Sequence, residues 1–237
     1  SYARHDLLLV GNWKLGLEPD RQPAGFADGF TPESVEKTRK TLAELRRLNP
    51  HAVIVSELSF YEYSDRWLPD DHPWWLRVNG ERKQFWPGTY RMDWNDPDYR
   101  AHVVRQTKAL QATGIDGVFY DNLRQDEPEP WKAFLRELRA AVGDDFLILV
   151  NSGYDFEGFD WLLPSINGIM YESGWSHGRT EWDACIAAMR HNETLLRPPR
   201  ISAIERFEDV RDYAGWPDRP GRDVLPPRDP AARRWTL

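Results

Sequence analysis

The stretch GIDGVFYDN, residues 114–122, decides the fold expected for this chain. Within it a short apolar run, Val118-Phe119-Tyr120, ends abruptly in Asp121 and Asn122. An apolar run of this length that is bounded by glycine and polar residues is typical of a buried strand. The question is why a buried strand should finish in a carboxylate and an amide, since polar groups are costly to bury without partners.

Six further stretches predict strands, and most of them also end in polar side chains. They are LLLVGNW (7–13), HAVIVSEL (51–58), TYRMDW (89–94), FLILVN (146–151), NGIMYE (167–172) and RISAIE (200–205). Helical spacing of apolar residues, with caps and stops, predicts helices over 31–50, 96–114, 128–143 and 180–192. Strands that alternate with helices indicate parallel βα units. We therefore expect an α/β fold of the (β/α)8 TIM-barrel type, with an open sheet as the alternative, and no eighth strand is identified.

A single catalytic domain over residues 1–237 is the expected organisation. An insertion rich in Trp is expected around residues 59–88, because this irregular stretch contains several of the twelve Trp residues. The last forty or so residues are rich in Pro and Arg, so the way in which the barrel closes at its C-terminal side stays open.

The bulk composition excludes some functions. A net charge of −7 and a pI near 5.4 argue against nucleic-acid binding, which needs clustered Lys and Arg. The one cysteine, Cys185, excludes an internal disulfide framework. No run of about 18 apolar residues is present, so no membrane span is expected. We expect a monomer outside the cell or in the periplasm, with its leader absent from this sequence, and the cytoplasm is the alternative.

Polar side chains gather where the predicted strands end. In a barrel of this type the C-terminal strand ends converge on one face, and the chemistry is built there. Each carboxylate alone also fits a salt bridge or a helix cap, but crowded like charges repel, so the set as a whole favours function. The candidate site residues, at strand ends and in the Trp-rich stretches, are Asn12, Trp13, Glu57, Trp86, Asp93, Trp94, Asp121, Asn122, Asn151, Glu172, Trp175 and Glu205.

Several carboxylates with aromatic neighbours suit glycoside hydrolysis. One carboxylic acid protonates the leaving oxygen, and a second carboxylate attacks the anomeric carbon or activates a water. No cofactor and no metal are expected, because the six His show no HExxH or other ligand spacing and no phosphate-binding fingerprint is present. Three alternatives stay open: a carbohydrate-binding barrel without turnover, a metal-dependent hydrolase or lyase that uses the same carboxylates, and a structural protein with the Trp-rich loop as its interface.

The motifs also carry a resemblance to a known family. GIDGVFYDN, followed two strands later by INGIMYES (166–173), resembles the barrel glycosidases of the endo-α-1,4-polygalactosaminidase type and, more closely, a related set of bacterial TIM-barrel glycosidases. WPGTYRMDWNDPDYRAHV (86–103) is similar to the third strand and following helix of that set. The resemblance covers about residues 50 to 175 and implies a barrel glycosidase acting on carbohydrate. Such proteins continue into an eighth strand, which is where this chain departs from the pattern.

The resemblance implies that Asp121 and Glu172 are the two catalytic carboxylates. We expect Asp121 to be the nucleophile or base and Glu172 the general acid, with the reverse assignment, or Glu205 in place of Glu172, as alternatives. Asn122 points away from Asp121 in a regular strand, so it is expected to support the site or to supply a turn. The residues expected to bind hydroxyl or amino groups or to stack on sugar rings are Asn12, Glu57, Asp93, Asn151, Trp13, Trp86, Trp94 and Trp175.

Overall fold

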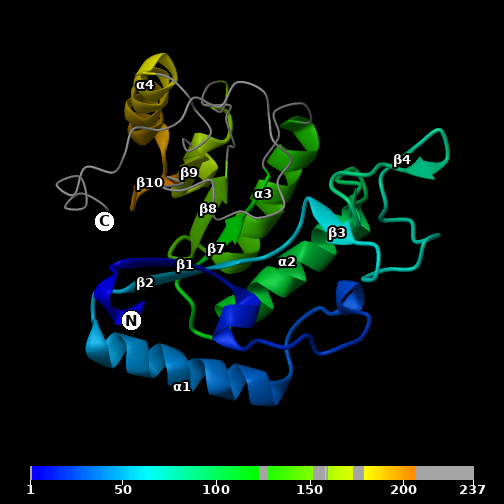
Figure 1. Ribbon diagram of the computed structural model, residues 1–237, viewed down its shortest axis with the longest axis horizontal. Coiled ribbons are helices and arrows are strands. Elements are labelled where there is room, and N and C mark those ends of the chain that lie inside the picture. Colours follow the sequence, from blue (N-terminus) through cyan, green and yellow to red (C-terminus); the bar gives the residue numbers. More distant parts are fainter. Residues whose placement is uncertain (1, 123–127, 152–157, 159, 173–178, 206–237) are drawn as a thin grey trace, which may run out of the picture.

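A six-stranded parallel sheet forms the centre of the protein (Figure 1). In this computed structural model the structure describes residues 2–122, 128–151, 158, 160–172 and 179–205. The strands, in their order across the sheet, are β1 (Leu7–Gly11), β2 (Val53–Glu57), β7 (Gly117–Tyr120), β8 (Leu147–Asn151), β9 (Gly168–Glu172) and β10 (Ile201–Glu205). Every neighbouring pair runs parallel, so all six strands end at the same edge of the sheet.

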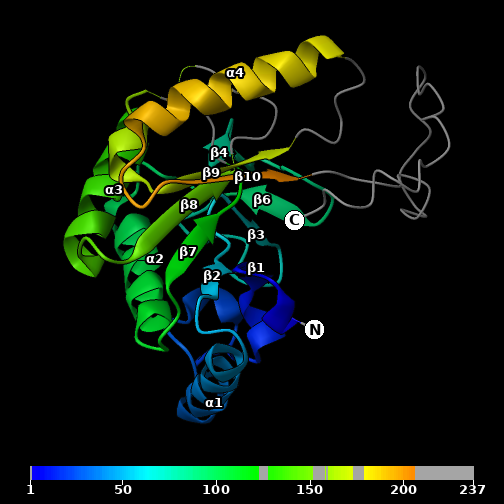
Figure 2. The ribbon, with the colours of Figure 1, turned by 90° about the vertical axis from the view of Figure 1, so that its left-hand side faces the viewer.

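Four α-helices connect or follow these strands, and Figure 2 shows them in an arc around one face of the sheet. They are α1 (Pro32–Leu48), α2 (Pro97–Gln111), α3 (Pro128–Val142) and α4 (Arg179–Leu195). Short 3-10 helices are η1 (Tyr2–Arg4), η2 (Asn12–Leu15), η3 (Ala24–Phe26) and η4 (Leu163–Ser165). The sequence sets the helix starts: Asp96 accepts the N–H of Asp98 at 2.8 Å, and a proline occupies the first turn of α2. None of the helices in the part of the chain that the structure describes is both long and apolar enough to cross a membrane.

Alternating side chains of the strands divide between two apolar clusters. Ile54, Val118 and Ile148 belong to the large core, to which the buried face of α3 also contributes. Val55 and Phe119 belong to a smaller cluster, with Leu147 and Leu149, on the other face of the sheet. Because the helices cover the first face, the smaller cluster marks the inner face of the curved sheet.

Residues 58–96, between β2 and α2, form two small antiparallel sheets, which we call the accessory sheets. β3 (Glu62–Ser64) pairs with β6 (Thr89–Arg91), and β4 (Arg77–Val78) pairs with β5 (Glu81–Arg82). A tight turn at Asn79-Gly80, with φ of 54° and 85°, joins β4 to β5. These sheets lie at the end of the molecule that Figure 1 shows on the right.

The predicted parallel βα pattern is confirmed, with one exception. Residues 89–94 were expected to form the third barrel strand, and this is wrong, because β2 pairs directly with β7. Instead β6 takes β3 as its partner from the same loop, and Arg91 in β6 is buried with its guanidinium 4.6 Å from the centre of the Tyr61 ring.

Candidate functional site

Three polar side chains meet where neighbouring strands of the sheet end. Glu57 is the last residue of β2, Asp121 directly follows β7, and Asn151 is the last residue of β8. Glu57 is two residues beyond Val55, and Asp121 is two residues beyond Phe119, so both continue the inner face of the sheet. The structure therefore brings together three of the side chains that the sequence placed at strand ends.

The Asp121 carboxylate is held by three N–H groups. Its Oδ1 accepts the side-chain amide of Asn151 at 2.6 Å and the backbone N–H of Asn122 at 2.9 Å. Its Oδ2 accepts the side-chain amide of Asn122 at 3.1 Å. Asn122 has a φ of 60°, in the left-handed region that Asn tolerates better than most residues, and this turn brings its carboxamide back onto Asp121. Asn122 therefore both supplies a turn and supports Asp121.

Glu57 is a half-buried carboxyl group beside Asp121. Burial and the neighbouring Asp121 carboxylate raise the pKa of Glu57 above its usual value of 4.5. A carboxyl group in this environment keeps its proton at a higher pH than an exposed one, which is the property expected of a general acid. The sequence had singled out Glu57 only for binding.

Glu62 is a site residue that the sequence prediction missed. A shallow pocket is lined by Glu57, the segment 58–62, Asp121 and Asn122. Glu62 in β3 accepts the side-chain amide of Asn122 at 3.3 Å through Oε1. No signal in the sequence marks Glu62, because it lies inside the irregular Trp-rich stretch and not at the end of a predicted barrel strand.

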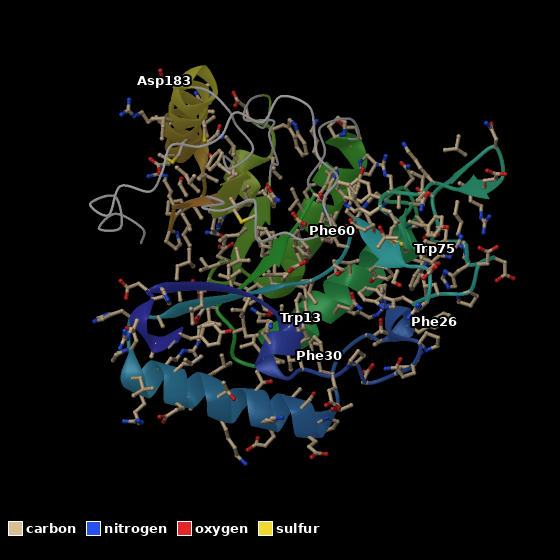
Figure 3. All side chains as sticks on the ribbon, in the orientation of Figure 1. Trp13, Phe26, Phe30, Phe60, Trp75 and Asp183 are labelled. Carbon is tan, nitrogen blue, oxygen red and sulfur yellow. The ribbon has the colours of Figure 1, made fainter. Side chains whose placement is uncertain are left out.

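Trp13 provides an exposed aromatic ring beside this edge. It lies in η2, directly after β1, with 61% of its surface exposed (Figure 3). A Cβ atom on Gly11 would lie 2.3 Å from the Trp13 ring, so the ring rests on the glycine backbone. Gly11 is in turn the register partner of Glu57. Asn12, which is half-buried, accepts the N–H of Leu17 through its backbone carbonyl at 3.2 Å.

Two of the expected site residues do not fit their predicted roles. Trp94 is fully buried and stacks on Trp131 with ring centres 5.1 Å apart, so its ring has no free face for a sugar. Asp93 does not end a strand of the main sheet; its Oδ1 accepts the backbone N–H of Asn95 at 3.0 Å in the turn before α2. Both errors follow from the mistaken third strand.

Trp86 is exposed but lies in the accessory sheets. Its ring packs edge-on against Phe85, and Phe85 packs in the same way against Tyr61, which lines the pocket. Trp86 is therefore separated from the pocket by two aromatic rings.

The remaining expected residues have side chains outside the described part of the structure. Glu172 and Glu205 end β9 and β10, and their backbones are register partners at the same edge as Glu57. Trp175 lies outside the described residues altogether. Within the described ranges, no three His, Cys, Asp or Glu side chains form a set that could hold a metal ion.

Residues 56–143 match the model of a family described as "Hypothetical glycosyl hydrolase family 15". This segment runs from the end of β2 to the end of α3 and includes Glu57, Glu62, Asp121 and Asn122. No curated protein sequence matches the chain.

Several solved structures share the fold. A noncanonic maltogenic alpha-amylase, AmyB from Thermotoga neapolitana, has a TM-score of 0.52 at 12% identity, and the alignment covers 83% of this chain and 58% of that one. The glycoside hydrolase domain of PelA from Pseudomonas aeruginosa has a TM-score of 0.51 at 18% identity, over 78% of both chains. Ega3 from Aspergillus fumigatus, in complex with galactosamine, has a TM-score of 0.50 at 16% identity, over 70% of this chain and 65% of that one.

These likenesses show the fold. The parallel sheet with its outer helices is part of a TIM-type barrel, the architecture of these glycoside hydrolases. The family matched over residues 56–143 is described as a glycosyl hydrolase family, which agrees with the family resemblance noted in the sequence.

Proposed function

We propose that this chain is a glycoside hydrolase that cleaves a polysaccharide or oligosaccharide with two carboxylates. Asp121 acts as the nucleophile or base, and Glu172 acts as the general acid. The observation that carries the proposal is the orientation of Asp121. Three N–H donors hold its carboxylate at the edge where the parallel strands have their C-terminal ends, next to the half-buried Glu57. Carboxylates at this edge are where barrel enzymes build their chemistry.

In the reaction, an oxygen of Asp121 attacks the anomeric carbon directly or takes a proton from an attacking water. At the same time the general acid gives its proton to the glycosidic oxygen, and the bond from that oxygen to the anomeric carbon breaks. Asn151 and Asn122 hold Asp121 in one orientation throughout, because their N–H groups occupy both of its oxygens. Trp13, exposed on the rim beside Gly11, supplies a flat face for a sugar ring.

Glu57 is the second candidate for the acid, and its raised pKa is the observation that favours it. If Glu172 is the acid, Glu57 instead binds a hydroxyl or amino group of the substrate. An amino sugar is the substrate class that we favour, since its cationic group suits this acidic edge and Ega3 was solved with galactosamine.

The experiment is a screen of the wild type and of Asp121→Asn, Glu172→Gln and Glu57→Gln on α- and β-linked polysaccharides, including galactosamine polymers. We expect the wild type to cleave one of them, and Asp121→Asn and Glu172→Gln to lose most of the activity while they stay folded. Glycan binding without cleavage by the wild type would favour a carbohydrate-binding barrel, and loss of activity with a chelator would favour a metal-dependent hydrolase. Full activity of Glu172→Gln would show that Glu172 is not the general acid, and Glu57 or Glu205 would then be assigned this role.

The anomeric configuration of the first product then separates the two mechanisms. Retention is expected if the two carboxyl groups lie about 5 Å apart, and inversion if they lie about 6.5–9.5 Å apart. Proton NMR during the first minutes of the reaction reads the configuration directly.

A further inference from the structure

Among the residues of the accessory sheets that line the pocket, Glu62 is the one with a carboxylate. It is the first residue of β3, paired in register with Arg91 of β6. Its neighbours in the pocket include Glu57 and Asp121, which come from the main sheet. Glu62 is therefore the point at which the small antiparallel sheets reach the end of β7.

The link between Glu62 and Asp121 is the side-chain amide of Asn122. The Asn122 Nδ2 lies 3.3 Å from Glu62 Oε1, 3.5 Å from Glu62 Oε2, and 3.1 Å from Asp121 Oδ2. A carboxamide has two N–H donors on one nitrogen, fixed in one plane. With one N–H directed at Glu62, the other is directed at Asp121, so the position of Glu62 sets the rotation of the amide.

The same amide is the donor that the structure gives to Asp121 Oδ2. Oδ1 is held separately, by Asn151 and by the backbone N–H of Asn122. Without an acceptor at position 62, the Asn122 carboxamide keeps only its contact with Asp121, so the donor to the Oδ2 side of the Asp121 carboxylate is less firmly fixed. A carboxylate that attacks a carbon atom has to be held within a fraction of an ångström of its productive position.

We propose that Glu62 is a positioning residue, which fixes the orientation of Asp121 through the Asn122 carboxamide. The inference rests on the proposed role of Asp121 and goes beyond it, because it makes the accessory sheets a working part of the site. Glu62 itself takes no part in bond breaking.

The first test is the kinetics of three substitutions of Glu62 on the polysaccharide that the wild type cleaves. Glu62→Ala removes the acceptor and is expected to lower kcat about tenfold or more, with little change in KM, because the reacting group is misplaced and the substrate is still bound. Glu62→Gln keeps an acceptor oxygen and is expected to stay within about threefold of the wild type. Glu62→Met fills the same space without an acceptor, and it takes the place of Glu62→Ala if that variant does not fold.

A double-mutant cycle shows whether the effect passes through Asn122. Asn122→Gly removes the carboxamide, while glycine tolerates the left-handed backbone at this position. In the Asn122→Gly background, Glu62→Ala is expected to change kcat by less than about twofold. The control is Glu81→Ala, an exposed carboxylate in β5 of the same accessory region, which should leave kcat unchanged.

Three results would overturn the inference: an unchanged kcat in Glu62→Ala, an equal loss of kcat with and without the Asn122 carboxamide, or a rise in KM alone. If the wild type cleaves no glycan, the proposed function fails, and NMR then tests the inference separately. The side-chain amide signal of Asn122 and the carboxyl carbon signal of Asp121 should both shift in Glu62→Ala and stay in place in Glu81→Ala. Unshifted signals in Glu62→Ala would refute the link between these residues.

Discussion

Replacing Trp94 with alanine tests whether this indole belongs to the core or to the substrate. The sequence predicts a stacking platform for sugar, whereas the structure buries the ring completely. The Trp94 ring stacks on Trp131 at an angle of 16° and contacts Phe60 edge-on, with ring centres 4.8 Å apart. Phe60 lies at the centre of the molecule (Figure 3). The substitution should therefore act on stability.

The magnitude follows from two opposing terms. Truncating a buried Trp to Ala costs about 3–5 kcal/mol, because transfer free energy is lost and a cavity remains. The Trp94 Nε1 has no hydrogen-bond partner among the residues that the structure describes, and removing an unpaired buried donor returns about 1 kcal/mol. The net loss is about 2–4 kcal/mol of unfolding free energy, which corresponds to a fall in Tm of roughly 4–16 °C for a chain of this size.

The assay is urea unfolding of the wild type, Trp94→Ala and Trp94→Phe, with Trp86→Ala as the exposed control. Trp94→Phe keeps an aromatic ring in the cluster and should fall between the wild type and Trp94→Ala. Trp86 is half exposed, and its removal should change stability by less than about 0.5 kcal/mol. A Trp94→Ala protein with unchanged stability and weakened glycan binding would refute the assignment of Trp94 to the core.

Three further substitutions test the site and the sheet. Burial and Asp121 raise the pKa of Glu57, so ionisation of Glu57 opposes folding as pH rises above its usual pKa of 4.5. Glu57→Gln should therefore be more stable than the wild type near neutral pH, and this gain should be absent below about pH 4. Equal urea midpoints of the two proteins at both pH values would contradict this. Burial lowers the pKa of His102, against the opposing effect of Asp28, so neutral His102 contributes fully to folding stability above its usual pKa of 6.5, and this contribution is lost as pH falls below that value. In His102→Asn, the stability measured by urea unfolding should therefore fall less steeply as the pH is lowered. A Cβ on Gly117 would lie 2.5 Å from the Cβ of Leu147, so Gly117→Ala should cost about 1–3 kcal/mol, and an unshifted urea midpoint would show that the strands separate without strain.

The sequence predicted the main sheet because its strands are long apolar runs with helices between them. Both faces of a parallel sheet are covered, so its strands contain apolar residues almost without interruption, and such runs are conspicuous. FLILVN and GVFYD are of this kind, and β8 and β7 lie where they were expected. The helix starts were equally predictable, because Thr31 and Asp96 cap their helices through contacts with residues two or three positions away.

The accessory sheets could not be predicted in the same way. TYRMDW combines β-formers with charges, and it fits a barrel strand and a short antiparallel strand equally well. The choice depends on pairing with Glu62–Ser64, more than twenty residues earlier, and on the burial of Arg91 against Tyr61. Both are contacts between residues far apart in the sequence. The same reason hid Glu62, whose importance lies in a contact with Asn122 across sixty positions.

The site contains an electrostatic conflict that stability alone does not explain. Glu57 and Asp121 lie close enough for Asp121 to raise the pKa of Glu57, so the two carboxyl groups destabilise each other when both are charged. Three N–H donors are directed at Asp121, whereas burial and its neighbour favour the neutral form of Glu57. The hydrogen bonds thus fix the orientation of Asp121, while Glu57 beside it is biased toward the acid. Acid–base chemistry uses a carboxyl group biased toward the acid beside an oriented carboxylate, and this is the observation that keeps Glu57 as the second candidate for the acid; packing alone does not require it.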